Sequence, residues 1–184
     1  MSTAHFVFAC DINSQSINHL LAGVMPLAAD PNIDTLYMLI ASNGGDVQCA
    51  LHAYNLIRAI PKMVTTHNVG NVDSAANVLF LAGATRYAAA DSKFMFHGVS
   101  FNVTTAPQSF NREQLANMEQ ALDNLNALMV AVVADRTTIA PAAVADLYRQ
   151  EQIKTPDQAL ADGIIHEIRP ADLNGATSVA YING

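Results

Sequence analysis

The chain has 184 residues, of which 51% are hydrophobic and 14% charged, and its formal net charge is −7. It is too apolar to be disordered, and its acidic excess argues against nucleic-acid binding, which needs clustered Lys and Arg. No stretch approaches the roughly 20 apolar residues of a membrane span, and no Lys or Arg precedes Arg58, so we expect a cytoplasmic protein with no membrane contact. The length suits a single domain over residues 1–184.

The first half of the chain alternates between strand and helix patterns. Short apolar or β-branched runs predict strands, and apolar residues at helical spacing predict helices. Ser14 or Ser16 is expected to cap the first helix, and the continuous apolar run 34–42 is typical of a strand buried on both faces. In chain order we expect strands at 5–12, 34–42 and 63–69, and helices at 14–30, 47–60 and 74–83.

The second half begins with two short strands within 85–99 and a polar, irregular segment at 100–111 that is typical of a surface loop. The longest predicted helix, 112–135, carries an apolar stripe. Shorter helices at 141–151 and 155–163 and a last strand at 164–168 follow. The alternation predicts an α/β fold with a largely parallel sheet.

Two turns resemble each other, because each follows an apolar strand and precedes a helix. They are "SNGGDV" at 42–47 and "GNVDSA" at 70–75. Ligands of parallel α/β folds bind at the carboxyl ends of strands, and glycines there let backbone N–H groups approach a reacting oxygen. Ser74 in the second turn fits either a helix cap or a nucleophile held at a strand end.

Among the six histidines, His97 has the placement that a general base needs. It ends the strand pattern "KFMFHG", with a glycine next to it, so it faces an edge or a cleft. A solvated histidine at a strand end is the alternative interpretation. Spacings typical of metal ligands and the lysine of a phosphate-binding loop do not occur, so we expect no metal site and no cofactor.

Taken together, the segments resemble the proteolytic subunit family of the Clp protease from about residue 5 to 169. "YMLIASNGGDVQCALHAYNLIRAI" is similar to the family's strand, Ser-Pro-Gly-Gly turn and helix. "GNVDSAANVLFLAGA" resembles its Gly-x-x-x-Ser nucleophile turn, and "DSKFMFHGV" its Asn-Ser-x-x-Met-Ile-His segment. "TPDQALADGIIHEI" is similar to the segment that closes the family's domain, and 112–135 to its handle helix.

The resemblance implies an α/β Clp/crotonase fold, made of stacked ββα units with a projecting handle helix. It also implies a serine peptidase with Ser74 as nucleophile and His97 as general base, in which the backbone N–H groups of Gly45 and Ala75 form the oxyanion hole. Peptides would be the substrates, no cofactor would be needed, and the chain would form a homo-oligomeric ring, expected to be a heptamer or two stacked heptamers.

The chain departs from the family pattern at several positions. Glu151 stands where the family has the aspartate of its triad, and Asp146 is a weaker substitute for that acid. Asn43 replaces a proline, and Gly98-Val99 replaces Gln-Pro beside the base. The first strand begins at about residue 5, which leaves no room for the family's axial loops, so we do not expect the usual partnership with an unfoldase.

Three functions are compatible with the residues. The first is a serine peptidase of the Clp type. The second is a catalytically weak or inactive ring protein that serves binding or scaffolding, which the departures at Glu151 and Gly98 favour. The third is a crotonase-like enzyme acting on acyl-coenzyme A, against which Ser74 and His97 argue.

Overall fold

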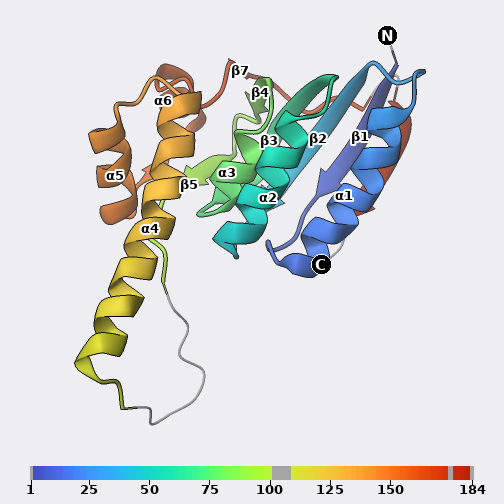
Figure 1. The fold of residues 1–184 in the computed structure, drawn as a ribbon. Coiled ribbons are helices and arrows are strands. Elements are labelled where there is room, and N and C mark those ends of the chain that lie inside the picture. The colour runs from blue at the N-terminus through green and yellow to red at the C-terminus, as the bar shows by residue number, and fades with distance from the viewer. Residues whose placement is uncertain (1, 101–108, 174–175, 183–184) are drawn as a thin grey trace.

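The computed structural model describes residues 2–100, 109–173 and 176–182. Within them a central sheet has the strand order β6-β5-β3-β2-β1-β8, and β4 joins it beside β3 and β7 (Figure 1). The strands are β1 (Thr3–Phe8), β2 (Thr35–Ser42), β3 (Met63–Asp73), β4 (Thr85–Ala88), β5 (Lys93–Met95), β6 (Ile153–Lys154), β7 (Glu167–Ile168) and β8 (Ala176–Ile182).

The helices are α1 (Ser14–Ala29), α2 (Val47–Arg58), α3 (Ala76–Phe80), α4 (Arg112–Arg136), α5 (Pro141–Arg149) and α6 (Pro156–Ala161). Strand pairing in the described residues is parallel except between β5 and β6, which confirms the predicted α/β class. Because parallel strands end at one edge, the turns that follow β2 and β3 lie together there.

The core lies between one face of the sheet and the helices. Alternate side chains of β1 and β2 are fully buried on that face, where α1 and α2 lie side by side over the strands (Figure 1). They are Phe6, Phe8, Leu36, Met38 and Ile40.

The opposite face of the sheet is only partly covered. Tyr37 and Ala41 of β2 are half-buried on this face and Leu39 between them is buried, so the expectation that 34–42 is buried on both faces is met only in part in the isolated chain. Val179 and Tyr181 of β8 are 53% and 61% exposed. An apolar sheet face left open in this way is typical of a subunit contact.

Helix α4 projects away from the sheet, as Figure 1 shows, and its observed bounds agree with the predicted helix at 112–135. Only Met129 and Val133 of this helix are buried, both in its second half. Leu115 near its start is 53% exposed. The apolar stripe therefore packs on the core at one end and is open at the other.

Several predicted details are wrong. Asn13, not Ser14 or Ser16, caps α1: its side chain accepts from the Ser16 N–H, and its own N–H donates to the Ser16 hydroxyl in return. The helix expected at 74–83 is reduced to α3, because Ser74 has a left-handed φ and the helix begins only after Ala75, its N-cap, and ends before Leu81, its C-cap. Strands β6 and β8 were not predicted, and most of the expected surface loop at 100–111 lies outside the described residues. Among the described helices, none is long and apolar enough to cross a membrane.

Candidate active site

Ser74 does not cap the helix that follows it. The N-cap position of α3 is Ala75, and no side-chain hydrogen bond caps this helix. Ser74 adopts a left-handed backbone with a φ of 56°, which is uncommon for a residue other than glycine and costs on the order of 1–3 kcal/mol. The capping interpretation is therefore wrong, and the strained strand-to-helix turn is the kind that presents a nucleophile.

Backbone and side-chain hydrogen bonds hold this turn. The Ser74 N–H donates to the Met95 carbonyl at 2.8 Å. The amide Nδ2 of Asn77, which is buried, donates to the carbonyls of both Ser74 and Met95, at 3.0 and 2.8 Å. The strained conformation is thus fixed against β5, the strand that leads to His97.

The glycine turn after β2 packs directly against the serine turn. Gly44 has a φ of 90°, and a Cβ atom on it would lie 2.5 Å from the Asp73 carbonyl oxygen and 2.8 Å from the Ser74 Cβ. Gly45 has a φ of 140°, and a Cβ there would lie 2.1 Å from the Ile12 carbonyl oxygen. Only glycine allows the two turns to approach so closely.

The N–H groups of Gly45 and Ala75 are free to bind a ligand. Neither donates a hydrogen bond within residues 2–100, 109–173 and 176–182. The position of a Gly44 Cβ would be 3.1 Å from the Ala75 nitrogen, so the glycine turn and Ala75 are neighbours. Two unpaired N–H groups beside a serine are suited to an oxyanion that forms next to the hydroxyl.

His97 lies two residues beyond β5 and is half-buried. Its Nδ1 is 2.9 Å from the Gly98 carbonyl oxygen. A carbonyl can only accept a hydrogen bond, so we assign the proton to Nδ1. The other ring nitrogen, Nε2, is then unprotonated, which is the tautomer that a general base requires.

The structure brings Ser74, His97 and Gly45 to one pocket of about 310 Å³. These three predicted site residues thus meet at the carboxyl ends of β2, β3 and β5. Ala75, the fourth, follows Ser74 directly in the chain. The complete lining consists of Asp11, Asn43, Gly44, Gly45, Val47, Ser74, His97, Val99 and Ser100.

Glu151 forms no hydrogen bond with His97 in the described part of the chain. It is exposed and follows α5 with a φ of 51°. The backbone nevertheless brings the neighbours of the two residues together. Met95 pairs with Ile153, and the Phe96 N–H donates to the Gln152 carbonyl, so the residues directly before His97 and directly after Glu151 are bonded to each other.

Asp146, the substitute acid, is engaged elsewhere. Its carboxylate lies 2.6 Å from the Arg149 guanidinium on the exposed side of α5. Because Asp146 pairs with Arg149, the group that orients the His97 ring in the described residues is the carbonyl of Gly98.

Sequence reasoning missed Asp11 as a residue of the site. Asp11 follows β1 just as the glycine turn follows β2, and Ile12 pairs with Gly45. The Ile12 N–H donates to the Gly44 carbonyl at 2.7 Å, and the Asp46 N–H donates to the Ile12 carbonyl at 2.8 Å. A polar residue at the carboxyl end of the first strand was the signal that could have identified it.

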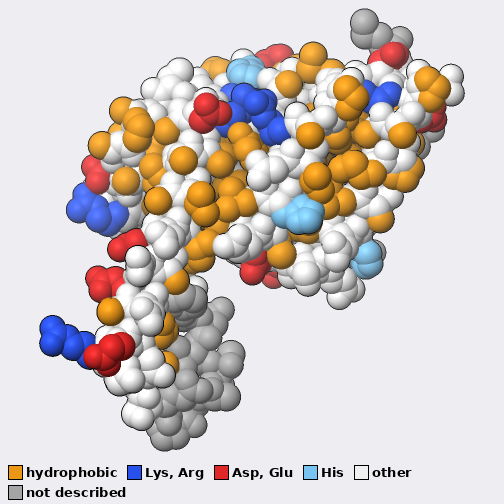
Figure 2. Space-filling model, viewed as in Figure 1, with side chains coloured by type: hydrophobic (Ala, Val, Ile, Leu, Met, Phe, Trp, Pro, Cys, Tyr) orange, Lys and Arg blue, Asp and Glu red, His pale blue; other side chains and the backbone are white. Residues whose placement is uncertain are grey.

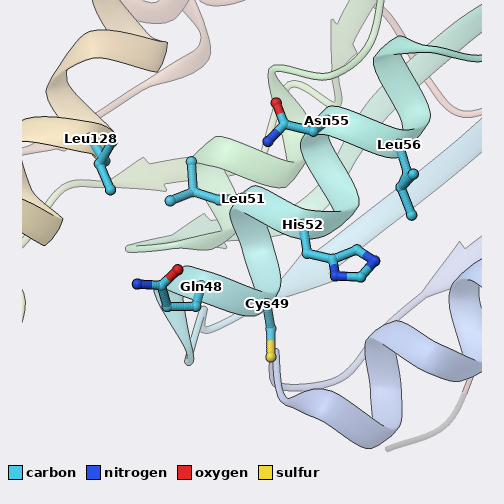
Figure 3. A pocket seen from close by; sticks show the side chains of 7 residues that line it. All are labelled: Gln48, Cys49, Leu51, His52, Asn55, Leu56 and Leu128. Atoms are coloured by element: carbon cyan, nitrogen blue, oxygen red, sulfur yellow. The ribbon is translucent and has the colours of Figure 1, made fainter.

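A larger hollow of about 710 Å³ lies between α2 and α4, over which Figure 2 shows hydrophobic side chains. It contains Cys49 and His52, whose thiol and ring point in different directions (Figure 3). Burial, followed by the neighbouring Asp46, raises the pKa of the Cys49 thiol, so it stays protonated at neutral pH. A protonated thiol is a poor nucleophile, so this pKa direction argues against Cys49 as a catalytic nucleophile. No group of three or more potential metal ligands occurs among the described residues.

Comparison with known proteins identifies related chains among the proteolytic subunits of the Clp protease. The chain is 26% identical to the ATP-dependent Clp protease proteolytic subunit 1 of Mycobacterium leprae, over 90% of this chain and 82% of the relative. It is 28% identical to the subunit 1 of Streptomyces avermitilis, over 63% of this chain and 55% of the relative. It is 35% identical to the proteolytic subunit of Oltmannsiellopsis viridis, over 50% of this chain and 48% of the relative. The chain thus spans about half the length of these last two relatives.

The fold also matches a solved structure. A ClpP1 variant from Listeria monocytogenes superposes with a TM-score of 0.78 at 18% identity, covering 91% of both chains, which confirms the Clp/crotonase fold. A family model described as Clp protease matches residues 1–171. The chain therefore belongs to the Clp protease family.

Proposed function

We propose that this chain is a serine peptidase that hydrolyses peptide bonds through an acyl-enzyme on Ser74. The observation that carries the proposal is the pocket shared by Ser74, His97 and Gly45. The positive φ of Ser74 and the unpaired N–H groups beside it support the same role.

The proposed reaction uses each group in turn. The unprotonated Nε2 of His97 takes the proton of the Ser74 hydroxyl while the oxygen attacks the peptide carbonyl. The Gly45 and Ala75 N–H groups stabilise the oxyanion, and His97 then protonates the leaving amine. A water molecule hydrolyses the acyl-enzyme by the same route and regenerates the hydroxyl.

Glu151 is our candidate for the acid that stabilises the imidazolium. A carbonyl such as that of Gly98 orients a neutral imidazole but supplies no negative charge. For Glu151 to serve, the His97 ring must release the Gly98 carbonyl and turn toward Glu151, whose neighbour Gln152 accepts from the Phe96 N–H. We propose that this rearrangement accompanies assembly or substrate binding.

A second candidate function is an inactive or weakly active ring protein. The absence of a bond between His97 and Glu151 within the described residues favours it. In that case the open sheet face and the projecting α4 would provide binding surfaces, and the pocket would not turn over a substrate.

Self-assembly is common to both proposals. We propose a ring of identical subunits, in keeping with the "proteolytic subunit" names of the relatives. The exposed Val179 and Tyr181 of β8 and the exposed part of α4 support contacts between copies.

Replacing Ser74 tests the function. Ser74→Ala removes one hydroxyl, so short fluorogenic peptides should no longer be hydrolysed while the thermal unfolding midpoint stays within a few degrees of wild type. Hydrolysis at the wild-type rate by this variant would disprove the nucleophile assignment. A wild-type protein that is folded, assembled and inactive would favour the second candidate.

A further inference from the structure

We propose that Asp11 makes the active-site pocket selective for peptides with a cationic group close to the scissile bond. The proposal rests on the peptidase function above and names a substrate class for it. The cationic group is the side chain of Lys or Arg, or a free N-terminal ammonium.

The first observation is that Asp11 is the acidic residue of the pocket lining. Its carboxylate shares the pocket with Ser74 and His97, and the remaining lining residues are Asn, Gly, Val and Ser. The described lining of the pocket therefore carries one fixed negative charge.

The second observation is that this charge has no cationic partner in the described structure. The ion pairs there join Lys93 to Asp73, Arg149 to Asp146, Lys154 to Asp162 and Arg169 to Glu167. Asp11 is exposed and hydrated, so the charge costs little in the empty pocket. A bound cation is the group that would pair with it.

The third observation is that the carboxylate is held in place. The Asn43 amide Nδ2 donates to Asp11 Oδ1 at 3.2 Å, and the Asn43 amide oxygen accepts from Asn71 Nδ2 at 3.0 Å. Asn71 Nδ2 also donates to Asp73 Oδ2 at 2.9 Å. This chain of bonds ties the Asp11 side chain to β3, which ends at Asp73 next to Ser74.

The Asp11 backbone is fixed as well. The hydroxyl of Ser16, which is buried, donates to the Asp11 carbonyl at 2.8 Å. The next residue, Ile12, is bonded on both sides to the glycine turn. A carboxylate whose backbone and side chain are both fixed loses little entropy when it pairs, so it can discriminate between ligands.

Asn43 is the residue that links Asp11 to Asn71, through the two ends of its side-chain amide. It occupies the place of a proline in the family pattern, and a proline has no side-chain amide to bond Asp11 or Asn71. The hydrogen bonds that join Asp11 to Asn71 through position 43 therefore need the asparagine side chain.

A lysine scan tests the proposal. Lysine, or its neutral analogue acetyl-lysine, is placed in turn at each position on both sides of the scissile bond of a neutral fluorogenic peptide. Exposed ion pairs are worth up to about 1 kcal/mol, so kcat/KM at the preferred position should be about three- to fivefold higher for lysine. The same peptides with free and acetylated N-termini separate recognition of a side chain from recognition of the terminal ammonium.

The readout is the ratio of the two kcat/KM values. In Asp11→Asn this ratio should fall to about one, whereas Asp91→Asn, which changes the net charge equally at an exposed position outside the pocket, should keep it. Raising the salt concentration should shrink the ratio in the wild type. The same ratio in Asp11→Asn as in the wild type, or no preference for lysine at any position nor for the free N-terminus, would overturn the proposal.

A binding measurement tests the selectivity of the pocket independently of the peptidase function on which the proposal rests. The affinity of labelled peptides for the Ser74→Ala protein is measured by fluorescence anisotropy, with and without Asp11→Asn. Tighter binding of the lysine peptide that disappears with Asp11→Asn supports the pocket's selectivity even where no hydrolysis occurs. Equal binding of both peptides contradicts it, whatever the outcome for catalysis.

Discussion

At the scale of single residues, the proposed catalytic pair is half prepared for reaction. Hydrogen bonds of the Ser74 N–H and carbonyl hold its backbone in the left-handed conformation. The strained backbone conformation of Ser74 is therefore already in place before any substrate binds. His97 has the correct tautomer, but its Nδ1 is bonded to the Gly98 carbonyl and not to a carboxylate. The charge that stabilises an imidazolium is the missing component.

Glu151 is the proposed source of this negative charge. If Glu151 accepts the Nδ1 hydrogen during catalysis, Glu151→Gln should lower kcat by at least about 100-fold, since loss of the orienting acid in a serine triad costs about 10⁴. Asp146→Asn, a matched change at another exposed acid near the site, should leave kcat within about twofold because this residue pairs with Arg149.

A second variant at this position, Glu151→Asp, keeps the negative charge and shortens the side chain by one methylene. Glu151→Asp should also lose activity if the backbone at its positive φ is adapted to the longer arm. A Glu151→Gln protein with wild-type kcat would show that the Gly98 carbonyl suffices and would remove Glu151 from the site.

At the scale of elements, the site depends on two turns that approach each other at the ends of β2 and β3. Gly44 is the point of closest approach, because its Cβ position is occupied by the Asp73 carbonyl and the Ser74 side chain. The geometry of the oxyanion donors is therefore a property of the paired turns and not of either turn alone.

Gly44→Ala should displace the turns and reduce peptide hydrolysis at least tenfold, because an error of about 1 Å at a reacting centre costs on the order of 100-fold. Gly70→Ala in β3 is the matched control, since its Cβ would make an ordinary 3.6 Å contact with Ala41. It should retain activity within about twofold. Circular dichroism checks that both variants fold, and equal activity of the two would contradict the packing argument.

Sequence patterns predicted most elements but not their ends. A continuous apolar run identified β2, a β-branched run identified the start of β3, and helical periodicity identified α1, α2 and α4. The predicted helix at 74–83 is shorter in the structure because Ser74 has a left-handed φ, so that the helix begins only after its N-cap Ala75. Strand β6 is only two residues long, too short for a periodic signal, and exists through its pairing with β5.

The same limit applies to the site. Ser74, His97, Gly45 and Ala75 were identified as candidates from motifs at strand ends and from the family resemblance. Asp11 was not, because its place in the pocket arises from the pairing of Ile12 with Gly45 across the sheet edge. The His97–Gly98 bond depends on a side-chain rotamer, which no sequence spacing specifies.

At the scale of the whole molecule, the chain leaves apolar surface uncovered. One sheet face carries the exposed Val179 and Tyr181, and the first part of α4 presents Leu115 to solvent. With only 14% charged residues, this surface is suited to contacts between copies of the chain.

Light scattering at micromolar concentration should therefore give a mass several times the 19.6 kDa of the chain, and seven or fourteen times that value for the proposed rings. Leu115→Glu places a charge on the exposed part of α4 and should lower the mass if this helix pairs two rings. A mass that stays near 19.6 kDa for the wild type would contradict the assembly proposal.

Covalent labelling tests the central claim, that Ser74 is an activated nucleophile, most directly. A fluorophosphonate probe reacts with a serine hydroxyl only when a base and an oxyanion hole activate it. We expect one probe adduct per chain, mapped by peptide mass spectrometry to Ser74 and absent from the Ser74→Ala and His97→Ala proteins. A folded, assembled wild-type protein that takes up no probe, or takes it up at another residue, would contradict the account.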